Sequence, residues 1–207
     1  MNEVNVFYNL EGIGDTLIVA LQDITLENRT FDRKGDVARV YDRESNVTGG
    51  FNIFNASSYL EVKETGNLTL TKELVEKINE ILAKNGFEET VEADLSPKFV
   101  VGYVAEKEKH PNADKLNICK VEIGTETLQI VCGAPNVDAG QKVVVAKVGA
   151  VMPSGLLIKE GNLRGEDSFG MLCSARELAI PGAPEVKGIL VLDDSAEVGS
   201  PFEVSTR

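Results

Sequence analysis

The sequence after Lys98 consists mainly of short apolar runs separated by glycine, and this feature most restricts the fold of the chain. Such runs are too short for most helices and are rich in valine and isoleucine, which is typical of strands. Five strands are predicted, at KFVVGYVAEKEKH, LNICKVEI, LQIVC, QKVVVAKVG and GILVL, with a hairpin turn at GTET and a bulge at Gly102. Only one brief helical stretch, near SARELAI, interrupts them. The pattern indicates a small, closed, all-β barrel.

The first 97 residues predict a small α+β unit instead. Four apolar runs, VNVFYNL, DTLIVAL, DVARVYD and TGGFNIFNAS, favour strands. A helix is predicted over 71–86, because Leu74, Ile78, Ile81 and Leu82 recur at helical spacing. Thr71 is the expected N-cap, and Gly86 the expected C-terminal stop.

An acidic stretch from Glu88 to Asp94, followed by LSPK, is typical of a linker. We therefore expect two domains, residues 1–97 and residues 98–207, with the boundary near Pro97.

The segment EGIGDTL contains glycines but is not expected to bind phosphate. Its glycine spacing differs from that of a dinucleotide-binding fold, and it lacks the Lys-Ser/Thr pair of a P-loop. A hairpin turn is the better interpretation.

Charge is distributed unevenly along the chain, which has a net charge of -12. Residues 1–97 carry 9 basic and 18 acidic side chains, a net of -9, and residues 177–207 carry 2 and 6, a net of -4. Residues 98–176 carry 10 basic and 9 acidic side chains, a net of +1. Only this middle segment would not repel a polyanion strongly through its net charge. Its charge therefore permits RNA binding but does not demonstrate it.

The cysteines and the single histidine argue against a disulfide framework and a structural metal site. Cys119, Cys132 and Cys173 are odd in number and widely spaced, so free thiols in a reducing cytoplasm are expected. With His110 they form no paired ligand spacing, so no metal and no cofactor is predicted. Neither a secretory signal nor a membrane span is predicted, because the most apolar stretch, 148–158, is short and interrupted.

Three motifs mix glycine, polar and apolar residues in a way that simple packing does not require: HPNADKL, QIVCGAPNVDAG and RGEDSFGMLCSARELAI. In the first, Pro111 fixes a backbone dihedral, while Asn112 and Asp114 can bond nearby backbone amides. The heptapeptide alone is therefore equally consistent with a self-capped turn of no further function.

Residues 98–202 closely resemble the tRNA-binding domain found in the phenylalanyl-tRNA synthetase beta chain and the methionyl-tRNA synthetase C-terminal extension. The resemblance rests on HPNADKL, IVCGAPNV, VAKVGAVMPSG, LRGEDSFGMLCSARELAI and GILVL, in that order. With its acidic first unit, the whole chain is similar to the stand-alone YtpR-type tRNA-binding proteins. The resemblance implies an OB-fold barrel and a non-catalytic protein that binds the folded body of tRNA.

An OB-fold binds a polynucleotide in a groove between one sheet face and its loops. Such a site needs cations for phosphates, small residues for close approach, and neutral donors. The predicted RNA contacts are Asn112, Lys115, Asn136, Arg164, Ser168, Met171 and Ser174. The residues predicted to shape the loops are His110, Pro111, Asp114, Gly133, Gly165 and Gly170. Aromatic stacking candidates are few (Phe99, Tyr103, Phe169), which favours recognition of RNA shape over a stacked single strand.

Several of these residues have simpler structural interpretations. Arg164 can pair with Glu166 or Asp167, and Ser174 can cap the ARELAI segment with Glu177 three residues later. Met171 is a residue type more often found in a core than in an RNA contact.

Two other function classes stay open at this stage. An enzyme would need a nucleophile, for which Cys173 is the best candidate, but no acyl-transfer motif surrounds it. A protein-interaction module would dimerise or dock on an aminoacyl-tRNA synthetase or ribosome-associated partner with little RNA contact. The net charge of -12 is the feature that favours this second class, and family resemblance makes a homodimer a reasonable expectation.

Overall fold

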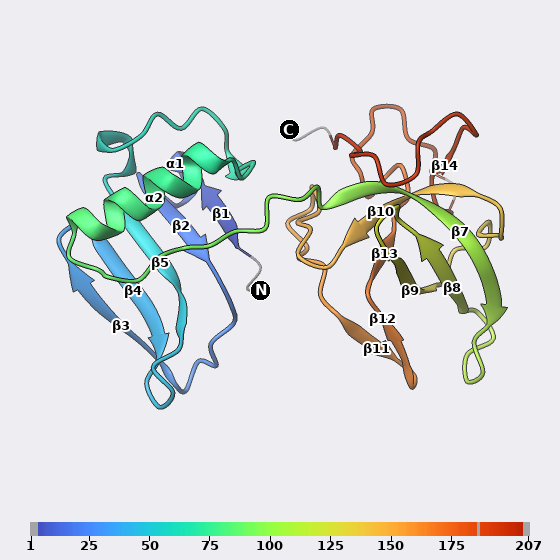
Figure 1. Cartoon of the computed structure of the whole chain (residues 1–207), viewed down its shortest axis with the longest axis horizontal. Helices are drawn as coiled ribbons and strands as arrows, with labels where there is room; N and C mark the ends of the chain where they lie inside the picture. Colours follow the sequence, from blue (N-terminus) through green and yellow to red (C-terminus); the bar gives the residue numbers. More distant parts are fainter. Residues whose placement is uncertain (1–3, 186, 205–207) are drawn as a thin grey trace. The chain divides into compact units, whose positions relative to one another are not determined.

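The computed structural model describes residues 4–185 and 187–204. The chain forms two compact units, Met1–Ser96 and Pro97–Arg207. Figure 1 shows both, with strands and one long helix in the first unit and strands throughout the second. Each unit has its own buried core.

The first unit is built on a six-stranded antiparallel sheet. Its strands occur in the order β3-β4-β5-β2-β1-β6. Their bounds are Asn5–Tyr8 (β1), Thr16–Ala20 (β2), Arg29–Lys34 (β3), Val37–Asp42 (β4), Thr48–Phe54 (β5) and Gly66–Asn67 (β6). Four of these strands, β1, β2, β4 and β5, confirm the four predicted from apolar runs.

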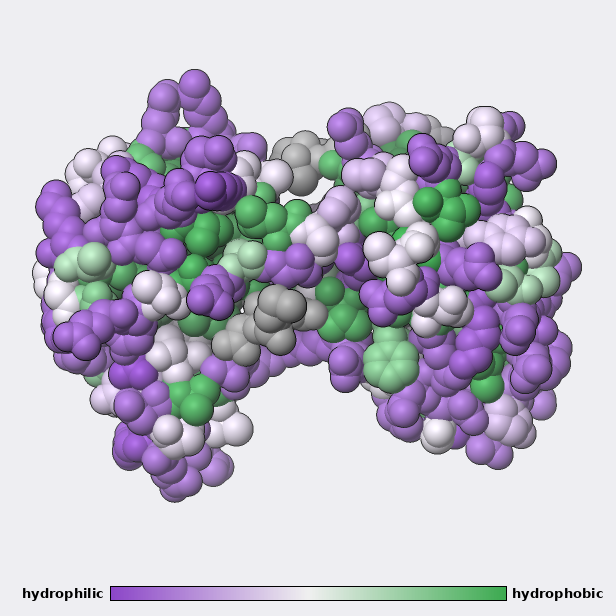
Figure 2. Space-filling model, in the orientation of Figure 1, coloured by the Kyte–Doolittle hydropathy of each residue, from purple (hydrophilic) through white to green (hydrophobic). Residues whose placement is uncertain are grey.

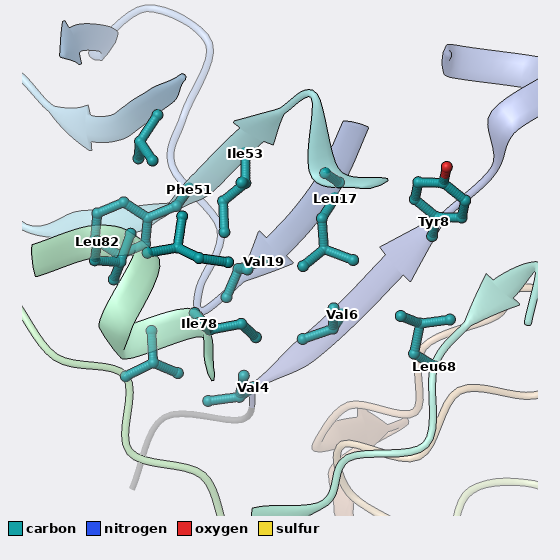
Figure 3. Close-up of a cluster of buried hydrophobic side chains, with 14 of the residues drawn as sticks. Val4, Val6, Tyr8, Leu17, Val19, Phe51, Ile53, Leu68, Ile78 and Leu82 are labelled. Atoms are coloured by element: carbon teal, nitrogen blue, oxygen red, sulfur yellow. The ribbon is translucent and has the colours of Figure 1, made fainter. Parts of the chain in front are cut away.

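One helix, α2 (Lys72–Lys84), packs on the sheet. Its side chains Ile78 and Leu82 are fully buried and point toward Val19 and Phe51 of the sheet (Figure 3). The Thr71 hydroxyl accepts a hydrogen bond from the Leu74 N–H, which confirms the predicted N-cap. The chain leaves the helix through Gly86, whose φ of +82° suits glycine.

Several elements of this unit were not expected, among them the two-residue strand β6 and a 3₁₀ turn at Ala56–Ser58. Strand β3 escaped prediction because its sequence, RTFDRK, is an exposed edge strand with charged side chains and no apolar alternation. The EGIGD segment is not a bare turn, because the one-turn helix α1 (Leu10–Ile13), capped by Asn9, extends into it. It still connects the antiparallel strands β1 and β2.

The second unit is all-β. Its main sheet has the order β13-β10-β7-β8-β9, and β14 also pairs with β10. A separate hairpin is formed by β11 and β12. The bounds are Phe99–Lys109 (β7), Asn117–Glu122 (β8), Thr127–Cys132 (β9), Lys142–Lys147 (β10), Gly161–Leu163 (β11), Glu166–Ser168 (β12), Gly170–Leu172 (β13) and Val191–Leu192 (β14).

The strand pairing in the described residues does not close a complete barrel, since β9 and β13 end the path of paired strands. The chain between β12 and β13 nevertheless reaches β9, because the Phe169 N–H donates to the Gln129 carbonyl at 2.9 Å. The sheet therefore curls toward closure at the point where two of the sequence motifs meet.

The predicted bulge at Gly102 is wrong. The β7–β8 register shifts between Val104 and Glu106, so the irregularity lies three residues further on. Gly102 is needed for packing: a Cβ there would lie 2.6 Å from a Val145 methyl and 2.8 Å from a Val121 methyl.

The SARELAI segment is a set of hydrogen-bonded turns and not a regular helix. It makes one helical hydrogen bond, from the Leu178 N–H to the Ser174 carbonyl. It then ends at Ala179, whose φ of +53° stops propagation. The predicted strand GILVL is likewise reduced to the two residues of β14.

Hydrophilic residues cover most of the visible face of each unit, with smaller apolar patches between them (Figure 2). Among the described residues, no helix is both long enough and apolar enough to cross a membrane.

Candidate nucleic-acid interface

The HPNADKL segment forms a tight turn between β7 and β8, and the imidazole of His110 organises it. The turn is closed by backbone bonds from the His110 N–H to the Leu116 carbonyl and from the Leu116 N–H to the Ala113 carbonyl. The Asn112 N–H donates to Nδ1 of His110 at 3.0 Å. Because Nδ1 accepts this bond, the ring proton lies on Nε2 in the neutral side chain.

The same imidazole connects this turn to the β11–β12 hairpin. Nε2 of His110 is 2.8 Å from the Leu163 carbonyl oxygen, so the ring donates to a residue 53 positions further along the chain. The Asn112 side-chain amide donates to the neighbouring Arg164 carbonyl at 3.4 Å. His110 is only 5% exposed, so the two bonds of its imidazole are partly shielded from water, whereas the bond from Asn112 to Arg164 is exposed. The lone histidine is thus a buried tether between two loops.

The tip of the β11–β12 hairpin turns through two residues in left-handed conformations. Arg164 has a φ of +54°, which is uncommon for a residue with a side chain, and Gly165 has a φ of +99°. The Gly165 N–H donates to the Asn162 side chain at 2.9 Å, and Asn162 in turn donates to Asp167 at 2.7 Å. This network fixes the tip that carries the Arg164 side chain.

The tether places two unpaired cations on loops that are bonded to each other. Lys115 and Arg164 are exposed, and within the described part of the chain neither forms an ion pair or a side-chain hydrogen bond. The interpretation in which Arg164 pairs with Glu166 or Asp167 is therefore not observed. Asp114 also lacks a hydrogen bond or ion pair among these residues, so its loop-shaping role stays a prediction. Pro111 lies exposed in the same turn.

Ser168 and Gly170 connect the hairpin to strand β9. The buried Ser168 hydroxyl accepts from the Val131 N–H at 3.1 Å and donates to the Gly170 carbonyl at 3.3 Å. Gly170 has a φ of +145°, and a Cβ there would lie 2.8 Å from the Ala146 carbonyl oxygen, so only glycine fits. A direct RNA contact by Ser168 stays a prediction, but its hydroxyl already positions the hairpin.

The remaining predicted residues surround a cavity of about 400 Å³. Met171 and Ser174 line it, as does Gly133. A Cβ placed on Gly133 would lie 3.8 Å from the Lys115 carbonyl oxygen, so the cavity borders the HPNADKL turn. Asn136 supports one wall, because its amide donates to the Ile189 carbonyl at 3.0 Å and accepts from the Ile189 N–H at 2.8 Å.

Ser174 forms the predicted capping box. Its hydroxyl donates to Oε2 of Glu177 at 2.7 Å and accepts from the Glu177 N–H at 3.2 Å. The Ser174 N–H donates to the same Oε2 at 2.7 Å. Any RNA contact by Ser174 would have to share a hydroxyl that is already engaged.

The three thiols are buried, and burial is the main reason that each pKa is raised. The pKa of Cys173 rises to about 12 and that of Cys119 to about 11, and that of Cys132 also rises. A thiol that stays protonated is a poor nucleophile, which counts against Cys173 as a catalytic group. The described residues also contain no cluster of three or more acidic, cysteine or histidine side chains suited to a metal ion.

Two cationic residues and one hydrogen-bonding partner lie at this surface although the sequence did not predict them. Arg176 and Lys187 line the cavity. The Gln129 amide donates to the Asp167 carbonyl at 2.9 Å, which holds the hairpin against β9. Arg176 lies in the RGEDSFGMLCSARELAI motif and could have been predicted from the sequence. Lys187 could not, because its place at the cavity depends on the bond between Asn136 and the backbone of Ile189, which are 53 residues apart.

Comparison with known proteins agrees with the division into two units. Residues 99–201 match the family described as "Putative tRNA binding domain", and residues 24–94 match "Domain of unknown function (DUF4479)". A Bacillus subtilis protein described as "Putative tRNA-binding protein YtpR" is 62% identical over 200 residues, covering 97% of this chain and 100% of the relative. The chain belongs to the YtpR family.

Other relatives match only part of this chain. The phenylalanine–tRNA ligase beta subunit of Campylobacter jejuni strain RM1221 is 61% identical over 108 residues, which cover 51% of this chain but 14% of the ligase subunit. A methionyl-tRNA-synthetase-related protein from Pyrococcus horikoshii is 20% identical with a TM-score of 0.38, covering 51% of this chain and 88% of that one. The ligase matches are therefore partial, whereas the YtpR match spans nearly the whole chain.

Proposed function

We propose that the second unit binds tRNA through its sugar–phosphate backbone, with Lys115 and Arg164 contacting phosphates. The observation that carries this proposal is the His110 tether, which holds the two unpaired cations on adjacent loops. A fixed pair of cations recognises the spacing of phosphates in a folded RNA and reads no base. Asn112 belongs to the same surface, and its amide has a second N–H for an RNA oxygen.

Shape recognition agrees with the supply of aromatic residues. Phe99 packs against a core cluster, whereas Phe169 is 37% exposed and lies next to the hairpin. Of the three stacking candidates only Phe169 is exposed, since Phe99 and Tyr103 are partly buried, and this gives little capacity for stacking successive bases. We infer that the curled sheet acts as an OB-type barrel whose loops grip a structured RNA, that the protein is non-catalytic, and that it works in the cytoplasm, where tRNA is used.

Equilibrium binding tests this proposal. Fluorescence anisotropy should give a lower Kd for labelled tRNA than for a single-stranded RNA of equal length. The double variant Lys115→Ala/Arg164→Ala should lose roughly tenfold or more in tRNA affinity, since each removes a phosphate contact. Lys72→Ala/Lys77→Ala, on helix α2 of the first unit, removes the same charge and should bind as wild type does. If both double variants lost tRNA affinity equally, net charge alone would explain the loss.

The alternative function, a protein-interaction module, is favoured by the charge balance. With a net of only +1 over residues 98–176, the electrostatic attraction of one copy to RNA is modest. A homodimer would double the cationic surface and raise affinity by avidity, so we propose self-association as part of RNA binding. Size-exclusion chromatography with light scattering tests this. A strict monomer at tens of micromolar would remove the dimer from the proposal, and docking on a synthetase would be the next partner to examine.

A further inference from the structure

The cavity of about 400 Å³ in the second unit is lined by residues of two motifs that are separated in the sequence. The end of β9 contributes Val131 and Cys132, and β13 contributes Met171 and Leu172. Its volume lies within the range of natural small-molecule sites. We propose that it receives one unpaired nucleotide of a bound RNA, an inference that rests on the proposed RNA-binding function.

The floor of the cavity is apolar and preformed. Cys132, Leu172 and Ile189 are each less than 8% exposed, and Met171 lies beside them. Aliphatic and thioether groups form a surface against which the flat face of a base can lie. A phosphate or other small anion would gain nothing from such a floor, whereas a base would bury its apolar faces there.

One wall is built around a glycine. A Cβ on Gly188 would lie between 2.6 and 2.9 Å from three atoms of the Asn136 amide group, and the φ of Gly188 is +158°. Asn136 therefore packs directly on the Gly188 backbone while bonding both backbone groups of Ile189. This arrangement keeps the wall in place without ligand, which lowers the cost of ordering it on binding.

The rim carries charged groups of both signs. Arg176 and Lys187 are exposed and, in residues 4–185 and 187–204, form no ion pair. Glu177 uses Oε2 in the capping box, which leaves Oε1 to accept from an exocyclic amine or a ring N–H of a base. Glu185 also stands on the rim and repels phosphate, so the phosphate is assigned to the side of Arg176 and Lys187.

The position of the cavity connects it to the two backbone cations. Gly133 lies against the Lys115 carbonyl, and Val131 is bonded to the Ser168 hydroxyl at the base of the hairpin. An RNA strand whose phosphates contact Lys115 and Arg164 therefore passes the mouth of the cavity. A nucleotide that is already unpaired enters without the cost of breaking a base pair, so unpaired positions are preferred.

The test uses two synthetic RNA hairpins with the same duplex, one blunt-ended and one with a single unpaired 3′ nucleotide, beside intact tRNA. Wild type should bind the overhang hairpin about fivefold more tightly. This gain is near the lower end of the range for one stacked base, because the base in this cavity contacts no aromatic ring. Replacing the unpaired nucleotide by 2-aminopurine should give a fluorescence change on binding that saturates with the anisotropy signal.

Two variants separate the cavity from the backbone contacts. Ala134→Trp places a bulky side chain in the cavity, and Lys187→Gln removes a rim charge at an exposed position. Both should abolish or reduce the preference for the overhang while binding the blunt hairpin as wild type does. Lys187→Gln alone keeps the test valid if Ala134→Trp fails to fold.

The outcomes distinguish the two proposals. Tight tRNA binding with equal affinity for both hairpins, or with a preference that survives both variants, overturns the nucleotide cavity and leaves the proposed function standing. Failure of wild type to bind tRNA overturns the proposed function itself.

Discussion

The two hydrogen bonds of the His110 imidazole can be removed separately, and this gives the sharpest structural prediction. In His110→Asn, the side-chain oxygen occupies roughly the place of Nδ1 and can still accept from the Asn112 N–H, but the side chain cannot reach the Leu163 carbonyl. In His110→Gln, the side-chain amide nitrogen occupies roughly the place of Nε2 and keeps the bond to Leu163, while the acceptor for Asn112 is lost.

Each variant is expected to lose about 1 kcal/mol of unfolding free energy, because one net hydrogen bond contributes about that much. His110→Ala loses both bonds and leaves a small void at a 5%-exposed site, so about 2–3 kcal/mol is expected. Urea denaturation followed by circular dichroism measures these differences.

RNA binding should distinguish the two variants even though their stabilities are similar. His110→Asn removes the buried bond to the Leu163 carbonyl and leaves only the longer bond from the Asn112 amide to the Arg164 carbonyl between the HPNADKL turn and the hairpin. The two loops that carry Lys115 and Arg164 are then held less firmly, and tRNA affinity should fall roughly threefold to tenfold. His110→Gln keeps that connection and should bind within about twofold of wild type. Equal tRNA affinities for wild type and His110→Asn would refute the reasoning that the tether serves RNA binding.

Four further predictions concern individual residues. Cys119 and Cys173 should resist a thiol reagent at about pH 8 until the protein unfolds, because burial raises each pKa far above that pH. The pKa of each buried thiol in the folded protein exceeds the unfolded value of 9.0, so the contribution of the two thiols to the free energy of unfolding is complete below pH 9. It declines between about pH 9 and pH 11–12, which thermal melts across that range can measure. Gly170→Ala should destabilise the protein by about 2 kcal/mol or more, since its Cβ would meet a backbone carbonyl; an unchanged Tm would contradict the packing argument. Thr71→Ala should cost about 1 kcal/mol in the first unit and leave tRNA affinity unchanged.

The sequence was most informative where local chemistry decides structure. The helix after Thr71 and four strands of the first unit follow from periodicity and capping, which depend on near neighbours. Strand β3 was missed because an edge strand needs no apolar face. The bulge was misplaced because glycine in a strand also serves close packing, as Gly102 does.

The candidate site also combines features that near neighbours determine with features that only the fold creates. The residue types of HPNADKL predict a turn, and the capping box at Ser174 follows from its spacing to Glu177. The bond from His110 to Leu163 spans 53 residues and exists only because the fold brings two loops together. The same holds for the bonds between the Asn136 amide and the Ile189 backbone, while the RNA contact predicted for Asn136 stays a prediction.

The salt dependence of tRNA binding by wild type and by Lys115→Ala/Arg164→Ala tests the central claim most directly. The affinity of both should fall as salt rises from about 50 mM to about 300 mM, with the slope of log K against log salt shallower in the variant by about 1.4–1.8, the value for two lost phosphate contacts. Parallel slopes, with or without a loss of affinity, would contradict the assignment of Lys115 and Arg164 to phosphates.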